Sequence, residues 1–164
     1  GSDFGASYLG RKEKDDTLRL ALAVGNILEE NGVNVIYTRT SDVYTSPAGK
    51  AAMANASGAD YFLSIHRNSS PYDNQYTGVE SLVYSKNGIA RTIAENINRE
   101  LTRVGFVNQG IQERPNLAVL RRTDMPAVLV EVGFINTDKD NIRFDTQFQE
   151  IARAIANGLL KSIS

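Results

Sequence analysis

The chain has 164 residues, of which 41% are hydrophobic and 23% charged, so we expect one folded domain and not a disordered chain. A formal net charge of −1 argues against a general nucleic-acid binder, and the absence of cysteine excludes disulfides, cysteine zinc sites and thiol nucleophiles. The sequence shows no signal peptide and no apolar run near the roughly 20 residues that span a bilayer.

Helical and strand-like patterns alternate along the chain. Helices are predicted where apolar residues recur every three to four positions, and strands where short β-branched or aromatic runs lie between turn residues. The predicted elements, in order, are a loop over residues 1–12, a helix from Glu13 to Asn31, a strand at Val33–Thr38, a helix from Ser46-Pro47 to about Ser57, a strand at Tyr61–His66, a loop at Arg67–Thr77, a strand at Gly78–Tyr84, a helix from Ile89 to about Gly105, an irregular connection at Phe106–Asn116, strands at Leu117–Leu120 and Ala127–Val132, and a last helix capped by Asp145 or Thr146. Interspersed helices and strands predict an α/β fold with a mainly parallel sheet.

His66, the only histidine of the chain, is a candidate functional residue. It lies where the predicted strand Tyr61–His66 gives way to a polar, turn-forming segment, and ligands of open α/β sheets bind beyond the carboxyl ends of strands. His66 is therefore a candidate metal ligand or acid/base group. Taken alone, a single histidine at a strand end is more often structural.

Glu131 lies between Val130 and Val132 in the most apolar predicted strand. A carboxylate is costly to bury there unless it is paired or bound to a metal. Burial also raises its pKa toward neutrality, which suits a general acid or base. The alternative is a glutamate that turns to solvent or pairs with Arg121 or Arg122, and the residues alone do not separate these interpretations.

Glu13, His66 and Glu131 together predict a metal site better than each does alone. Glu13 by itself is most simply a solvated residue of a first helical turn, but all three are expected on one rim of the sheet. Catalytic zinc takes about three protein ligands and keeps one position for water. We therefore expect Glu13 and His66 as two ligands and Glu131 as the base that takes the water proton. The third ligand is not evident, and histidine chemistry without a metal stays open.

Six short motifs, spread over nearly the whole chain, follow one another in the order seen in a known enzyme family. The motifs are Glu13-Lys14-Asp15, Thr38-Arg39 with Asp42, Ala54-Asn55, Ser64-Ile65-His66-x-Asn68, Leu117-x-Val119-Leu120-Arg121 and Pro126–Phe134. Through them the chain resembles the zinc-dependent N-acetylmuramoyl-L-alanine amidases, which are peptidoglycan hydrolases of the autolysin type. The resemblance implies a single three-layer α/β domain with a twisted, mostly parallel sheet flanked by helices.

The resemblance also implies a function and roles for individual residues. The family cleaves the amide between N-acetylmuramic acid and the L-alanine of the stem peptide. Glu13 and His66 match zinc ligands, and Glu131 matches the catalytic glutamate. Asn68, Asn116 and Arg121 are candidate substrate contacts. The implied setting is an exported, monomeric protein of the cell wall whose partner is peptidoglycan, with no nucleic-acid or membrane partner.

The chain departs from the family pattern at its start. Family members begin with a strand that ends in Asp-x-Gly-His-Gly-Gly, and that histidine is the first zinc ligand. Residues 1–6 match the segment just after this motif, so we expect the catalytic domain over residues 1–164 to be N-terminally incomplete. Lys50 stands where arginine is common, and Arg67 stands where a small residue is common. With two protein ligands for one zinc ion, metal affinity is expected to fall sharply.

Two other functions remain open. One is a catalytically inactive, metal-free module that binds the wall or regulates an enzyme, which the missing ligand favours. The other is a different zinc hydrolase, such as a peptidase on stem peptides. Free L-alanine amino termini among the products indicate an amidase, whereas cleavage between peptide residues indicates a peptidase.

Overall fold

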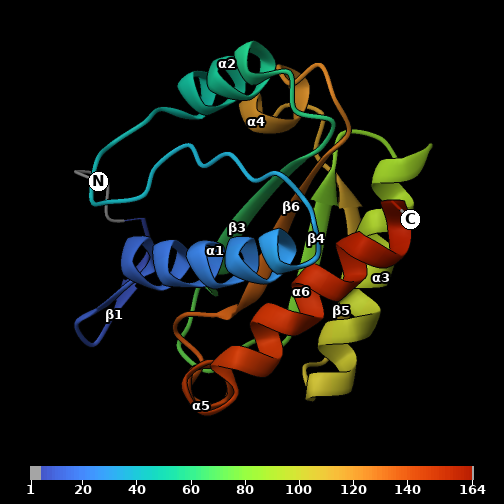
Figure 1. Cartoon of the computed structure of the whole chain (residues 1–164). Coiled ribbons are helices and arrows are strands. Elements are labelled where there is room, and N and C mark those ends of the chain that lie inside the picture. Colours follow the sequence, from blue (N-terminus) through green and yellow to red (C-terminus); the bar gives the residue numbers. More distant parts are fainter. Residues whose placement is uncertain (1–4, 164) are drawn as a thin grey trace.

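A four-stranded sheet runs through the centre of the molecule, with helices on both of its faces (Figure 1). The structure, a computed structural model, describes residues 5–163. The strands are β1 (Ser7–Tyr8), β2 (Arg11–Lys12), β3 (Phe62–Asn68), β4 (Val79–Val83), β5 (Asn108–Glu113) and β6 (Ala127–Phe134). The helices are α1 (Glu13–Glu30), α2 (Pro47–Ser57), α3 (Ile89–Val104), α4 (Ala118–Arg121), α5 (Asp138–Thr146) and α6 (Phe148–Ile163).

The central sheet has the strand order β3-β6-β4-β5. The β3–β6 and β4–β5 pairs are parallel, and the β4–β6 pair is antiparallel. The short strands β1 and β2 form a separate hairpin ahead of α1. The predicted α/β fold with a mostly parallel sheet flanked by helices is therefore confirmed.

The two faces of the sheet contact different apolar clusters. Val128, Val130 and Val132 of β6 pack in the larger cluster, which α1, α3 and α6 complete. The alternate residues Ala127 and Leu129 pack instead in a smaller cluster with α4. Side chains of a strand alternate between faces, so Glu131 lies on the α4 side, in step with Ala127 and Leu129. We call this side the α4 face and the other the helix face.

The helices α1, α2 and α3 begin and end close to where the sequence predicts. α1 starts at Glu13 with acidic residues in its first turn, which meet the positive end of the helix dipole. Ser46 caps α2 by accepting a hydrogen bond from the Gly49 amide at 3.0 Å, and Pro47 is the first helical residue. α3 ends at Gly105, whose φ of 126° is a conformation that other residues rarely adopt.

The prediction of a strand at Val33–Thr38 is wrong. This segment has no regular secondary structure, although its composition is strand-like. A strand needs a neighbour for its backbone groups. Within residues 5–163, β3 is the edge of the sheet, and a cavity of about 790 Å³ lies between β3, α1, α2 and the Val33–Thr38 segment. No strand lies there to complete a ladder with either side, among the residues the structure describes.

Two further predictions are wrong in the second half of the chain. The segment Leu117–Leu120 was predicted as a strand, but most of it lies in the one-turn helix α4. The helical turn buries Val119 and Leu120 on the sheet, and the Arg121 amide donates to Leu117 O at 2.8 Å. Phe106–Asn116, predicted as irregular, contains the edge strand β5. The β5 sequence NQGIQE has too few apolar or β-branched residues to be predicted as a strand. Its backbone hydrogen bonds with β4 stabilise the strand instead.

Two local elements were also not predicted. The loop expected at residues 1–12 contains the β1–β2 hairpin, and residues 1–4 lie outside the described part of the chain. The last helix begins at Phe148, after the separate helix α5, so Asp145 and Thr146 end one helix instead of capping the next. α5 has a weakly apolar sequence, and burial of Phe144 and Asn141 against the body of the protein holds it in place.

Candidate functional site

The carboxylate of Glu13, at the start of α1, lies directly against His66 of β3. Glu13 Oε2 is 3.1 Å from His66 Nδ1 and accepts a hydrogen bond from the Arg67 amide at 3.0 Å. Glu13 Oε1 accepts one from the Ala6 amide at 3.2 Å. Burial by itself raises the pKa of Glu13, but His66 and the two amides outweigh it and bring that pKa below its ordinary value. Glu13 is therefore ionised at neutral pH.

Ser64 holds the other side of the His66 ring. His66 Nε2 is 3.0 Å from Ser64 Oγ. The two residues are two positions apart on β3 and so share the α4 face. In the neutral ring this arrangement corresponds to Nδ1–H donating to Glu13 and Nε2 accepting the Ser64 hydroxyl. The His66 side chain remains 34% exposed, so its orientation is set by two partners while the ring stays accessible.

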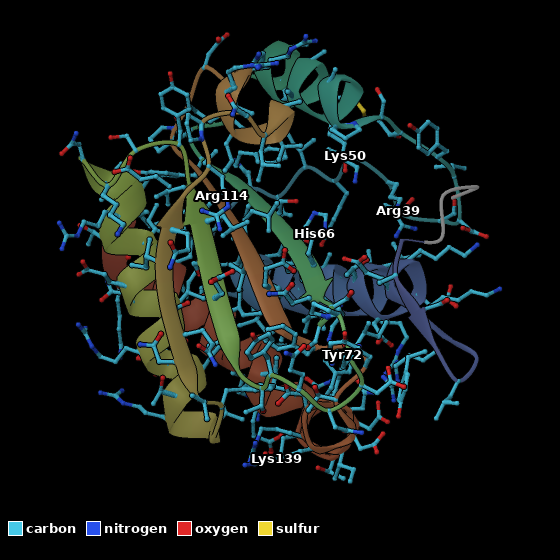
Figure 2. The ribbon with its side chains drawn as sticks, turned by 180° about the vertical axis from the view of Figure 1, so that it is seen from behind. Arg39, Lys50, His66, Tyr72, Arg114 and Lys139 are labelled. Carbon is cyan, nitrogen blue, oxygen red and sulfur yellow. The ribbon has the colours of Figure 1, made fainter. Side chains whose placement is uncertain are left out.

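His66, Glu131 and Glu80 form a row across three adjacent strands. His66 of β3 pairs in register with Glu131 of β6, which pairs in register with Glu80 of β4. Directly paired residues stand side by side on one face of a sheet. Figure 2 views the molecule from this side, with His66 in front of the sheet and the long helices behind it. Glu131 thus lies between an imidazole and a second carboxylate.

Glu131 has a strongly raised pKa. Its Oε2 atom is buried and has no hydrogen-bond partner among residues 5–163. Burial, with smaller contributions from the charges of Glu13 and Glu80, raises the pKa of Glu131 to about 7, against an opposing effect of His66. The alternative pairing of this atom with Arg121 or Arg122 is therefore not present in the described part of the chain. A carboxyl group that is half protonated near neutrality can accept a proton and return it.

His66 and Glu131 lie inside their strands and not at the ends. β3 continues to Asn68 and β6 to Phe134, with an irregularity in their register between His66 and Asn68. The prediction that Arg67 begins a loop is wrong. Its side chain is fully buried on the helix face, where it finds charged and polar partners that its neighbours in sequence do not reveal.

The three predicted substrate contacts are not joined to this group. Asn68 follows His66 on β3, and its side-chain oxygen accepts a hydrogen bond from the Ser69 amide at 2.9 Å. Asn116 and Arg121 are exposed, in and near α4. α4 packs on the α4 face through Val119 and Leu120, so these two residues are on the same side of the sheet as Glu131. Their roles stay predictions.

The cavity beside β3 ends at the candidate site. Its lining includes Glu13, Ser64 and His66, together with apolar residues of α1 and of the Val33–Thr38 segment. Leu63 and Ile65 of β3 remain partly exposed toward this space, whereas the matching residues of β6 are fully buried. The candidate site therefore borders this cavity.

Sequence reasoning did not single out Ser64 or Glu80. Ser64 was detectable, because the alternation of β3 places it with His66. Glu80 was not, because its position opposite Glu131 depends on the register between β4 and β6.

The Glu13–His66 pair has the chemistry and spacing of two zinc ligands. Zinc binds imidazole nitrogen and carboxylate oxygen at about 2.0–2.2 Å in tetrahedral sites, which places two such ligand atoms about 3.3 Å apart. The observed separation of 3.1 Å is close to this value. Within residues 5–163, however, no group of three or more histidine, cysteine or acidic side chains is arranged around one ion position. The described residues thus fit zinc as two of the three usual ligands.

Comparison with known proteins agrees with this geometry. The profile of the family described as N-acetylmuramoyl-L-alanine amidase, Amidase_3, matches residues 1–161. The chain belongs to this family. It is 41% identical to the N-acetylmuramoyl-L-alanine amidase CwlM of Bacillus licheniformis, over the whole chain and 65% of that protein. It is 42% identical to the sporulation-specific N-acetylmuramoyl-L-alanine amidase of Bacillus subtilis, over 97% of the chain and 63% of that protein.

Solved amidase structures share the fold. The crystal structure of an N-acetylmuramoyl-L-alanine amidase from Clostridium difficile 630 has a TM-score of 0.91 and 32% identity, and the match covers 98% of the chain and 90% of that structure. The AmiC2 amidase of Nostoc punctiforme has a TM-score of 0.90, also at 32% identity, and covers 98% of the chain and 90% of that structure. The chain nevertheless spans just under two thirds of the length of the two Bacillus relatives. No helix in residues 5–163 has the length and apolarity to cross a membrane.

Proposed function

We propose that the chain is the catalytic domain of a peptidoglycan hydrolase that cleaves the amide between N-acetylmuramic acid and the L-alanine of the stem peptide. One observation carries this proposal. Glu131, a buried carboxyl group whose pKa is raised to about 7, stands beside His66, which is paired with Glu13. The names of the related amidases support the same reaction and indicate the cell wall as its location.

The residues of the chain divide the reaction between them. Glu131, in its ionised form, accepts a proton from the attacking water and delivers it to the nitrogen of the leaving L-alanine. Glu13 and His66 would hold the zinc ion, with the Arg67 amide and Ser64 fixing their orientation. When bound, zinc lowers the pKa of water and polarises the scissile carbonyl. Desolvation of Glu131 keeps its proton affinity close to neutral pH, as such a transfer requires.

The direct test is hydrolysis of purified peptidoglycan by the chain, with and without added zinc. We expect free L-alanine amino termini to appear in step with zinc and to disappear with a chelator. New amino termini at other residues of the stem peptide would identify a peptidase and contradict the proposal. The molar mass of the purified chain, measured by light scattering without peptidoglycan, tests the proposed monomeric state.

A metal-free, wall-binding or regulatory module is the second candidate. The observation that favours it is that the described residues supply two zinc ligands instead of three. Extending the N-terminus with a strand that ends in Asp-x-Gly-His-Gly-Gly separates the candidates, because the family pattern places its first zinc ligand in this motif. We expect the extended chain to bind zinc more tightly and to hydrolyse peptidoglycan faster. Binding to peptidoglycan without hydrolysis, in both chains, would favour the second candidate.

A further inference from the structure

Arg67 is the most completely bonded charged side chain near the candidate site. Its Nε donates to Val132 O at 2.6 Å, Nη1 to Asp16 Oδ2 at 2.8 Å and Nη2 to Asn141 Oδ1 at 2.9 Å. The guanidinium also lies 4.3 Å from the centre of the Phe144 ring. The side chain has no exposed surface. Because guanidinium is planar, these contacts hold it in one orientation.

Two of these partners lie close in the chain to residues of the candidate site, while Asn141 and Phe144 belong to α5. Arg67 follows His66 on β3, and Val132 follows Glu131 on β6. Asp16 lies one helical turn after Glu13 on α1. A single guanidinium on the helix face therefore joins the three elements whose residues meet around His66. In addition, the Arg67 amide donates directly to Glu13 Oε2.

The first turn of α1 has no side-chain cap at its N-cap position. Lys12 occupies the N-cap position and makes no capping hydrogen bond through its side chain. Asp16 is instead bonded by Arg67 and by Arg11, whose Nη1 lies 3.1 Å from Asp16 Oδ2. Arg11 belongs to the hairpin just before α1, and its other ion pair is with Asp145 of α5. The Arg11–Asp16 pair therefore does not connect α1 to β3. The hydrogen bond that joins Asp16 to β3 is made by Arg67, which also bonds Val132 of β6.

We propose that Arg67 is a positioning residue, which fixes the first turn of α1 against β3 and β6 and thereby places the Glu13 carboxylate on His66 Nδ1. This rests on the proposed function only in assigning Glu13 and His66 to the site; the geometry holds without a metal. A lysine at this position keeps the charge but cannot make the three divergent hydrogen bonds. Loss of the tie lets the first turn of α1 shift, and Glu13 moves with it.

The test uses the ring nitrogens of His66 in the metal-free chain. Because the chain has one histidine, its imidazole ¹⁵N signals need no assignment among several residues. In the wild-type chain we expect the Nδ1–H form to predominate. In Arg67→Lys we expect this preference to be lost, and we expect the same in Glu13→Gln, where an amide replaces the carboxylate acceptor.

A matched control separates positioning from general stability. Arg143 also lies over a phenylalanine ring, 5.5 Å from the centre of Phe106, but none of its described contacts is with Glu13, His66 or Glu131. We expect Arg143→Lys to leave the imidazole signals unchanged, even where it lowers the melting temperature as much as Arg67→Lys does. If Arg67→Lys fails to fold, Asp16→Asn weakens the same tie from the α1 side, and we expect it to move the signals in the same direction.

Zinc affinity provides the second measurement. For the chain extended by the histidine-bearing strand, we expect Arg67→Lys to weaken zinc binding about tenfold, as for other residues that orient metal ligands. Unchanged imidazole signals in folded Arg67→Lys and Asp16→Asn would overturn the positioning role. Changed signals in a protein without amidase activity would support positioning and contradict the proposed function alone.

Discussion

Arg67 and Glu131 are two charged residues on adjacent strands that the fold buries on opposite faces of its sheet, and their surroundings differ. On the helix face, Arg67 has a hydrogen-bond partner for each side of its guanidinium. On the α4 face, a carboxylate oxygen of Glu131 is buried with no partner among residues 5–163. We propose that the unpaired group carries the chemistry, because a carboxylate without compensating bonds is destabilised as an anion and takes up protons near neutral pH. The paired group, in the same proposal, maintains the geometry.

The largest expected effect comes from removing the unpaired carboxylate. In a chain that hydrolyses peptidoglycan, we expect Glu131→Gln to lower kcat by about 10²–10⁴-fold, the usual contribution of a general base. Zinc content should be unchanged, because Glu131 is not one of the proposed ligands. The measurement is the rate of amino-terminus release together with metal analysis. Full activity in this variant would rule out the role given to Glu131.

Removing the paired charge is expected to reduce stability. Arg67→Met keeps much of the side-chain volume but leaves Asp16 with Arg11 alone and Val132 O and Asn141 without their donor. We expect the free energy of unfolding to fall by about 3 kcal/mol, the lower end of the range for breaking a buried ion pair. Urea unfolding followed by circular dichroism measures it. Exposed Arg91, whose ion pair with Glu95 lies on the surface of α3, provides the control, and Arg91→Met should change stability by less than about 0.5 kcal/mol.

The pH dependence of stability distinguishes the two groups further. The pKa of Glu131 is raised to about 7 in the folded chain, whereas its ordinary value is 4.5. The folded chain therefore keeps a proton that the unfolded chain releases, and the free energy of unfolding decreases as the pH rises from 4.5 to 7. We expect Glu131→Gln to be more stable than the wild type by about 1–3 kcal/mol at pH 8 and nearly equal to it at pH 4. Urea titrations at the two pH values measure this. Equal stability at pH 8 would show that the Glu131 pKa is not raised.

The smallest expected effect concerns Glu80, whose charge adds to the raised pKa of Glu131. We expect Glu80→Gln to lower that pKa slightly, so that the acid limb of the pH–activity profile moves to lower pH with little change in the maximum rate. Glu95→Gln, on the exposed face of α3, is the matched control and should leave the profile in place. A shift in the opposite direction, or an equal shift in both variants, would contradict the role of Glu80.

Secondary structure was predicted correctly where its signal lies within a few neighbouring residues. The prediction failed where a segment's structure depends on a strand or sheet that is distant in the sequence. The helices at Glu13 and Ser46-Pro47 and the buried strand before His66 have capping residues or apolar runs within a few positions of one another. Val33–Thr38 has an equally good strand composition but no ladder, whereas the polar segment Asn108–Glu113 forms a strand because β4 pairs with it. The run Leu117–Leu120 likewise has a strand-like composition, but packing of Val119 and Leu120 against the sheet stabilises the helix α4 there.

The sequence by itself determined the α/β class and the family and predicted the candidate residues Glu13, His66 and Glu131, because each of their motifs is contiguous in the chain. The tertiary structure decided how these residues are arranged. The 3.1 Å contact between Glu13 and His66, the row that sets Glu131 beside Glu80, and the burial of Arg67 each depend on strand register and on the position of α1. Register and helix docking join residues that are 50 or more positions apart, and the raised pKa of Glu131 arises from the desolvation that this assembly produces.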